Sequence, residues 1–151
     1  FIVRAARAGT ITHLKLSSDS GGASSTYSHY VNMIVIDHGD GTQATYMHLK
    51  HASAQSGITC GATVTQGQAL AYAGTTGHST GIHLHFHVAK VHPGVATCEC
   101  GSSGLSCAAD YNPFPNVWVS STYPSVPISF AEWSTASQCS NRRITMPASQ
   151  N

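Results

Sequence analysis

The chain has 151 residues, enough for one domain with a buried core. Charged residues make up 9% of it, against about 25% in an average soluble domain, and the formal net charge is +1. This composition excludes a charge-driven binder of nucleic acid or of an anionic membrane surface, and no apolar run approaches the roughly 20 residues that span a bilayer. Ten histidines stand against six acidic residues, and this surplus requires an explanation.

Strand and turn signals alternate from the first residues onward. Ile2-Val3 and the alternating segment 10–16 are typical of strands, and a Ser/Gly-rich loop follows at 17–28. The β-branched segment 31–36 ends in a turn whose Asp40-Gly41 pair is a strong hairpin signal. Segment 42–49 is therefore the expected return strand.

Further strands are expected at 68–73 and 82–88, on either side of a Gly/Thr/Ser loop at 74–81. No 3.6-residue period lasts for ten residues. The sequence therefore predicts an all-β fold, either a sandwich or a small barrel.

The composition changes after residue 92, which suggests a β core over 1–92 and an irregular extension over 93–151 that packs on it. This extension is rich in Cys, Ser and Pro. Disulfides that stabilise the tail of a secreted protein are the expected role of the cysteines. A zinc site is the alternative for three of them, and the odd count leaves one thiol free or paired outside the chain. The cysteines are Cys60, Cys98, Cys100, Cys107 and Cys139, and the alternative zinc site would use Cys98, Cys100 and Cys107.

Alternate residues of segment 82–88 are histidines. In a strand, His83, His85 and His87 share one face, about 7 Å apart along the chain, and the intervening side chains face the core. Those intervening residues are Ile82, Leu84, Phe86 and Val88. Such a row either binds a metal ion or is simply the wet face of a half-exposed strand. His48 lies on the expected strand 42–49, on the same face as Ala44 and Tyr46.

Three sequence blocks together resemble the lysostaphin-type (LytM/LasA-like) zinc metalloendopeptidases. They are Val35-Ile36-Asp37-His38-Gly39-Asp40-Gly41 with Tyr46-Met47-His48-Leu49, then Val64-Thr65-Gln66-Gly67-Gln68, and last residues 74–86, which end in His83-Leu84-His85-Phe86. The resemblance implies an antiparallel β fold with a groove (the duplicated hybrid motif). It also implies hydrolysis of peptide bonds in bacterial cell-wall cross-bridges, with one zinc ion as cofactor and a peptide or peptidoglycan cross-bridge as substrate.

The resemblance also implies a role for three histidines. His85 matches a zinc ligand, His83 matches a histidine that polarises or deprotonates the reacting water, and His48 matches the partner of that histidine. The residue types of the chain agree with a histidine base. Its two glutamates are Glu99 and Glu132, and neither belongs to an H-E-x-x-H helix. A metal-activated water would therefore need histidine as its general base, which an ordinary pKa near 6.5 allows.

The sequence departs from the family pattern in two places. The family's remaining zinc ligands, a His and an Asp four residues later, precede the strand that corresponds to Ile2-Val3, and no H-x3-D occurs anywhere in this chain. His87 stands where the family commonly has Glu. Because the chain opens directly on a strand without an initiator Met, we expect its N-terminus to have been cut.

Three interpretations follow from these observations. The chain is part of a longer, active zinc peptidase, or it is a non-catalytic descendant that serves as a wall-binding or assembly module among protein neighbours in an extracellular structure. The third is a histidine-based pH switch, because protonation of ten histidines would change the net charge greatly. No nucleic-acid partner and no membrane span are expected in any of them.

Overall fold

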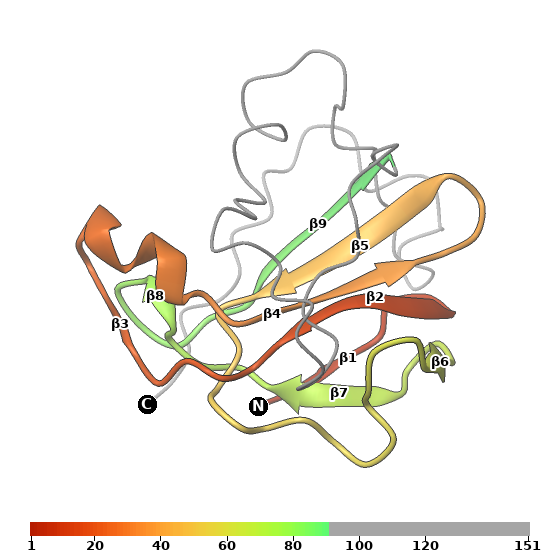
Figure 1. Cartoon of the computed structure of the whole chain (residues 1–151), viewed down its shortest axis with the longest axis horizontal. Helices are drawn as coiled ribbons and strands as arrows, with labels where there is room; N and C mark the ends of the chain where they lie inside the picture. The colour runs from red at the N-terminus through yellow and green to blue at the C-terminus, as the bar shows by residue number, and fades with distance from the viewer. Residues whose placement is uncertain (91–151) are drawn as a thin grey trace, which may run out of the picture.

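The computed structural model describes residues 1–90, which form short strands and one 3-10 helix (Figure 1). In chain order the elements are β1 Ile2–Arg4, β2 Gly9–Lys15, β3 Gly21–Gly22, η1 Ser25–Tyr30, β4 Met33–Asp37, β5 Thr42–Met47, β6 Thr63–Val64, β7 Ala69–Tyr72, β8 Gly77–His78 and β9 His85–Lys90. The prediction of a mostly β chain is confirmed. No helix within this part of the chain is long and apolar enough to cross a membrane.

The strands form one large sheet and two small ones over the described residues. The five-stranded sheet has the order β6-β2-β4-β5-β9, with antiparallel pairing throughout. β1 pairs with β7 in an antiparallel two-stranded sheet that lies beneath the large sheet in Figure 1. The third sheet, β3 with β8, is parallel and only two residues long, whereas the two other sheets are antiparallel as expected.

The main hydrophobic core joins the five-stranded sheet to the β1–β7 sheet. Burial of apolar side chains from both sheets in one cluster is what holds the two layers together. The fully buried members include Val3 and Leu70 from the small sheet and Ile11, Ile34, Ile36 and Tyr46 from the large one. Leu84, Phe86 and Val88 pack against this cluster, as the alternation of segment 82–88 predicts.

The face of the large sheet that points away from the main core carries both polar and apolar side chains. Register places His13, Val35, Thr45 and His87 side by side across four strands, and Met33, Met47 and His85 in the row next to them. These side chains alternate with the core residues of the same strands, because successive side chains of a strand point to opposite faces. The histidines of β9 therefore lie on the face away from the main core.

The structure corrects several details of the predicted elements. β5 ends at Met47 rather than at residue 49, and β9 begins only at His85. Ile82 is 70% exposed and does not reach the core, because it precedes the strand in a bend. Segment 17–28 contains β3 and the start of η1, and the loop 74–81 contains β8. The extension 93–151, with four of the cysteines, lies outside the described residues, so its packing and its disulfides stay predictions.

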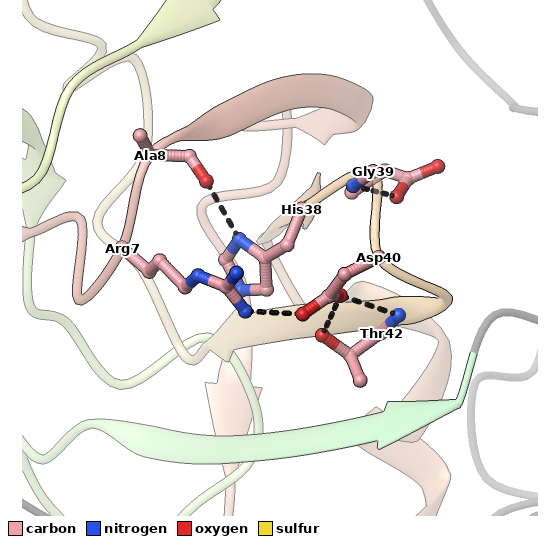
Figure 2. A network of polar contacts seen from close by, with 7 residues as sticks. Arg7, Ala8, His38, Gly39, Asp40 and Thr42 are labelled. Atoms are coloured by element: carbon pink, nitrogen blue, oxygen red, sulfur yellow. Dashed lines mark hydrogen bonds and ion pairs between the residues drawn. The ribbon is translucent and has the colours of Figure 1, made fainter.

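The predicted hairpin turn between β4 and β5 is present, and polar contacts tie it to the β1–β2 connection (Figure 2). Asp40 accepts hydrogen bonds from the backbone N–H and the hydroxyl of Thr42 and pairs with Arg7 at 2.5 Å. The hydrogen bond from the Thr42 hydroxyl and the contact with Arg7 hold the pKa of Asp40 well below its usual range. His38 Nδ1 donates to the Ala8 carbonyl oxygen at 2.8 Å, which links the same two segments.

Candidate active site

His48 lies directly after the end of β5, where the backbone turns into the left-handed region with φ of 62°. This backbone conformation is uncommon for a residue with a side chain, although histidine adopts it more often than most. Because of this turn, the His48 side chain does not point to the same face as Ala44 and Tyr46, so the predicted shared face is wrong. The residue is 6% exposed, and its Nδ1 lies 2.7 Å from the carbonyl oxygen of Thr76.

His83 lies in the connection before β9, where it forms an isolated antiparallel bridge with Gly74. Its Nδ1 lies 2.8 Å from the Gly81 carbonyl oxygen and 3.3 Å from the Ser79 hydroxyl. Its ring centroid is 4.6 Å from that of His48, with the two planes tilted by 37°. The ring itself is exposed, so His83 stands between solvent and the buried His48.

His85 is the first residue of β9 and completes the group. Its ring centroid lies 5.9 Å from that of His48 and 5.4 Å from that of His87. His87, which the sequence predicts on the same face, places Nδ1 3.3 Å from His85 Nε2. The structure thus brings together His48, His83 and His85, the three residues that the motifs single out, with His87 beside them.

The surroundings keep the inner histidines uncharged at neutral pH. Burial, and to a lesser extent the neighbouring rings of His87, His48 and His83, lower the pKa of His85 to about 4. Burial also lowers the pKa of His48, against the opposing effect of its hydrogen bond to Thr76, and burial lowers the pKa of His87. Neutral imidazole is the form that accepts a proton or binds a metal ion.

Hydrogen bonds fix the proton position on His48 and on His83. A carbonyl oxygen can only accept, so Nδ1 of each ring carries the hydrogen and Nε2 of each ring carries the lone pair. The two neighbouring rings therefore share the same tautomer, and each has a proton acceptor at Nε2.

Residues that the motif comparison did not single out support this arrangement. The Thr76 hydroxyl donates to the Leu49 carbonyl oxygen and accepts from the backbone N–H of Asn32. The side-chain amide of the buried Asn32 donates to the carbonyl oxygens of Leu49 and Ser18, which ties the β2–β4 connection to the segment after β5. The only sequence signal for these residues is the Gly/Thr/Ser composition of the loops.

The histidine cluster supplies fewer metal ligands than a catalytic zinc requires. A catalytic zinc normally takes three protein ligands and a water. Within residues 1–90, no group of three or more His, Cys, Asp or Glu side chains converges so as to hold an ion. The described residues therefore do not fit a complete zinc site by themselves, although His85 and His87 bring two imidazole nitrogens close together.

Comparison with known proteins places the chain in a family. The model of Peptidase family M23 matches residues 2–97. The chain belongs to this family, as the resemblance in its motifs indicates. An uncharacterized metalloprotease of Haemophilus influenzae is 35% identical over 98 residues, which cover 62% of this chain and 18% of that protein. The chain thus spans less than a fifth of the length of this relative.

Two of the solved structures that are similar to the chain come from other bacteria. One is a mutant catalytic domain of the prophage-encoded M23 protein EnpA from Enterococcus faecalis, 22% identical, with a TM-score of 0.45 over 68% of this chain and 69% of that chain. The other is the catalytic domain of the antimicrobial peptidase lysostaphin from Staphylococcus simulans, 27% identical, with a TM-score of 0.41 over 58% of this chain and 56% of that chain.

Proposed function

We propose that this chain is the peptide-hydrolysing part of a metallopeptidase that cleaves cross-bridges of the bacterial cell wall. The observation that carries the proposal is the cluster of His48, His83 and His85, whose rings come together from the end of β5 and the start of β9. Membership of Peptidase family M23 and the metalloprotease relative support the reaction class. The substrate class rests on the family resemblance.

His48 and His83 are the proposed catalytic residues. Each directs an Nδ1 hydrogen into a backbone carbonyl and leaves Nε2 as an acceptor, so either can take a proton from the attacking water. His83 is exposed and can reach the substrate, while the buried His48 lies against its ring and orients it. Burial lowers the pKa of His48, which keeps this base unprotonated at neutral pH.

His85 is the proposed metal ligand from β9, and zinc is the proposed metal. Zinc, when bound, polarises the scissile carbonyl and lowers the pKa of its water. Since the described residues do not complete the site, the proposal requires ligands from elsewhere in the native protein, such as a His-x3-Asp segment upstream of Ile2. The native protein is proposed to be secreted, with the extension 93–151 held by disulfides.

The experiment measures metal content and cleavage on the native protein. Elemental analysis should find about one zinc per chain, and a glycine-containing wall peptide should be cleaved. His48→Ala and His83→Ala should each lower kcat by about 10²- to 10⁴-fold, the usual contribution of a general acid or base. His51→Ala is the matched control, because His51 is exposed, lies close to His48 in sequence and belongs to no part of the cluster.

The outcomes separate the peptidase from the non-catalytic alternative. Native protein that holds no metal and cleaves nothing, yet binds purified wall material, would establish the wall-binding or assembly module instead. Equal loss of activity in His51→Ala would show that the effect is not specific to the cluster. Circular dichroism of each variant shows whether the fold has survived.

A further inference from the structure

The hydroxyl of Ser79 lies beside the exposed ring of His83, although the serine itself is buried at 4% exposure. Both residues belong to the connection between β8 and β9. The Ser79 Oγ lies 2.8 Å from the Gly81 carbonyl oxygen, 3.0 Å from the Thr75 hydroxyl and 3.3 Å from His83 Nδ1. A buried hydroxyl is thus in contact with the ring that the proposed function uses as a base.

The directions of these hydrogen bonds follow from which atoms carry a hydrogen. A hydroxyl has one hydrogen and a carbonyl oxygen can only accept, so Ser79 gives its hydrogen to Gly81. The Thr75 hydroxyl then donates to the Ser79 oxygen. Toward His83 the Ser79 oxygen can only accept, as can the Gly81 carbonyl oxygen, 2.8 Å from the same Nδ1. Two acceptors therefore face His83 Nδ1, and both favour the form of the ring that carries its hydrogen there.

An exposed imidazole depends on such contacts to keep its hydrogen on one nitrogen. A neutral ring in water can carry the hydrogen on either nitrogen, and only the unprotonated one accepts a proton. The ring of His83 lies against the ring of His48 with the two planes tilted by 37°. This ring contact limits the movement of His83 but does not distinguish its two nitrogens. The choice between the nitrogens therefore depends on the acceptors at Nδ1.

Ser79 is well suited to hold these acceptors in place, because it is itself held from two sides. Its backbone N–H donates to the Gly22 carbonyl oxygen at 3.0 Å, which connects it to β3. Its side chain is buried and accepts from Thr75. Gly81, by contrast, is exposed, and the hydrogen bond from Ser79 holds its carbonyl oxygen in position.

Ser79 and His83 are not arranged as a nucleophile and its base. A nucleophilic serine directs its hydrogen at an unprotonated histidine nitrogen and exposes its oxygen to the substrate. Here the serine hydrogen goes to Gly81, Nδ1 of His83 carries a hydrogen of its own, and the hydroxyl is buried. Ser79 therefore acts on the reaction only through the ring of His83.

We propose that Ser79 is a positioning residue for His83, which keeps the hydrogen of this ring on Nδ1 and thereby leaves Nε2 as the acceptor for the proton of the attacking water. The inference deepens the proposed function and rests on it for the role of His83. Ser79 contributes one acceptor itself and aligns the nearer one, the Gly81 carbonyl oxygen. Without the Ser79 hydroxyl the ring can adopt the other form, in which Nε2 carries the hydrogen and accepts nothing.

NMR of the full chain, expressed with ¹⁵N-labelled histidine, tests the hydrogen position directly. Protonated and unprotonated ring nitrogens differ strongly in ¹⁵N shift, and at pH 8 an ordinary imidazole is neutral. We expect His83 to carry its hydrogen on Nδ1 in the unchanged chain and to become a mixture of both forms in Ser79→Ala. Thr80→Ala, at the exposed neighbouring residue, should leave the shifts as they are. Equal His83 shifts in Ser79→Ala and the unchanged chain would overturn the proposal.

Kinetics with the glycine-containing wall peptide provide the second measurement. In Ser79→Ala, kcat should fall by about 10- to 100-fold with KM nearly unchanged, because a misoriented base affects the reaction more than the binding. Ser79→Cys, which keeps a weak donor of similar size, should lie between Ser79→Ala and the unchanged chain. Thr80→Ala should retain full activity. An unchanged kcat in Ser79→Ala would contradict the proposal.

A double substitution separates positioning of His83 from a general structural role. Since Ser79 acts only through the ring of His83, adding Ser79→Ala to His83→Ala should lower kcat no further. A second loss of the same size in that background would show that Ser79 supports the fold and not the base, and would overturn the inference.

The inference and the proposed function fail in different ways. A shift of the His83 hydrogen in Ser79→Ala, in a protein that hydrolyses no peptide, would leave the positioning by Ser79 standing and remove the peptidase. Hydrolysis at an undiminished kcat in Ser79→Ala would leave the peptidase standing and remove the role of Ser79.

Discussion

The ring of His83 covers the ring of His48 at a centroid distance of 4.6 Å, although the two residues come from separate segments. The contact depends on the backbone at both positions. His48 leaves β5 with a left-handed φ of 62°, and His83 is held by its bridge to Gly74. Each ring then donates from Nδ1 to a backbone carbonyl of the 74–84 connection.

The left-handed backbone of His48 gives a prediction about stability. Such a φ costs a residue with a Cβ about 1–2 kcal/mol, whereas glycine adopts it freely. His48→Gly should therefore be more stable than His48→Ala by about 1 kcal/mol in urea unfolding. At His51, whose φ is not in this region, the order should be reversed, with alanine the more stable. If His48→Ala were more stable than His48→Gly, the left-handed φ would not limit stability at position 48.

The Thr76 hydroxyl gives a second prediction. It satisfies the Leu49 carbonyl and the buried N–H of Asn32, so Thr76→Val leaves both without this partner at nearly unchanged volume. We expect a loss of about 1–3 kcal/mol in the free energy of unfolding, measured with urea. Thr76→Ser, which retains the hydroxyl, should recover most of it.

The matched control for Thr76 is Thr10→Val on β2. Thr10 is exposed, so the substitution should change the free energy of unfolding by less than about 0.5 kcal/mol. Equal losses at positions 76 and 10 would mean that the buried hydrogen bonds contribute nothing specific.

The sequence predicted four of the five strands of the large sheet, all except β6, because the signals for those strands are local. The Asp40-Gly41 turn lies between β4 and β5 as expected, and the alternation of residues 84–88 sorts Phe86 and Val88 to the core. The motif blocks also selected the three histidines that the fold brings together. Signals of this kind depend on side-chain type and spacing alone.

The contacts that orient the site could not be predicted in this way. Thr76 and Gly81 act on the histidine rings through main-chain carbonyls, which every residue possesses. The left-handed turn at His48 has no marker such as glycine, so the sequence predicts a strand that ends at residue 49, two residues beyond the end of β5. Ile82 satisfies the alternation and is nevertheless exposed, because β9 starts only at His85.

Gly77 gives a prediction for the loop that carries these contacts. Its φ is 76°, and an added Cβ would lie 2.7 Å from Val31 Cβ. Gly77→Ala should cost about 1–3 kcal/mol and should also lower activity, because the strained position adjoins Thr76. Gly81→Ala is the control, since a Cβ there meets nothing within 4 Å and its φ is not left-handed. Thermal melts of the two variants compare them directly, and a Gly77→Ala melt equal to that of Gly81→Ala would refute the steric argument.

The depressed pKa values predict how the metal-free protein responds to acid. The pKa of His85 falls from 6.5 to about 4 on folding because burial disfavours the charged ring, and those of His48 and His87 are lowered in the same direction. Between these two pH values the unfolded chain binds more protons than the folded protein, so the free energy of unfolding falls as the pH falls. The contribution of His85 is complete above pH 6.5 and is lost as the pH falls to about 4. The contributions of His48 and His87 change in the same direction.

Urea titrations of metal-free protein at a series of pH values measure this effect. In His85→Gln the ring that titrates is gone, so the decline between pH 6.5 and 4 should become shallower. A His85→Gln profile parallel to that of the unchanged chain would mean that His85 is no harder to protonate in the folded protein than in the unfolded one. Burial would then lower the pKa of the neighbouring histidines and not that of His85, so it would not be what keeps this imidazole neutral and able to bind metal.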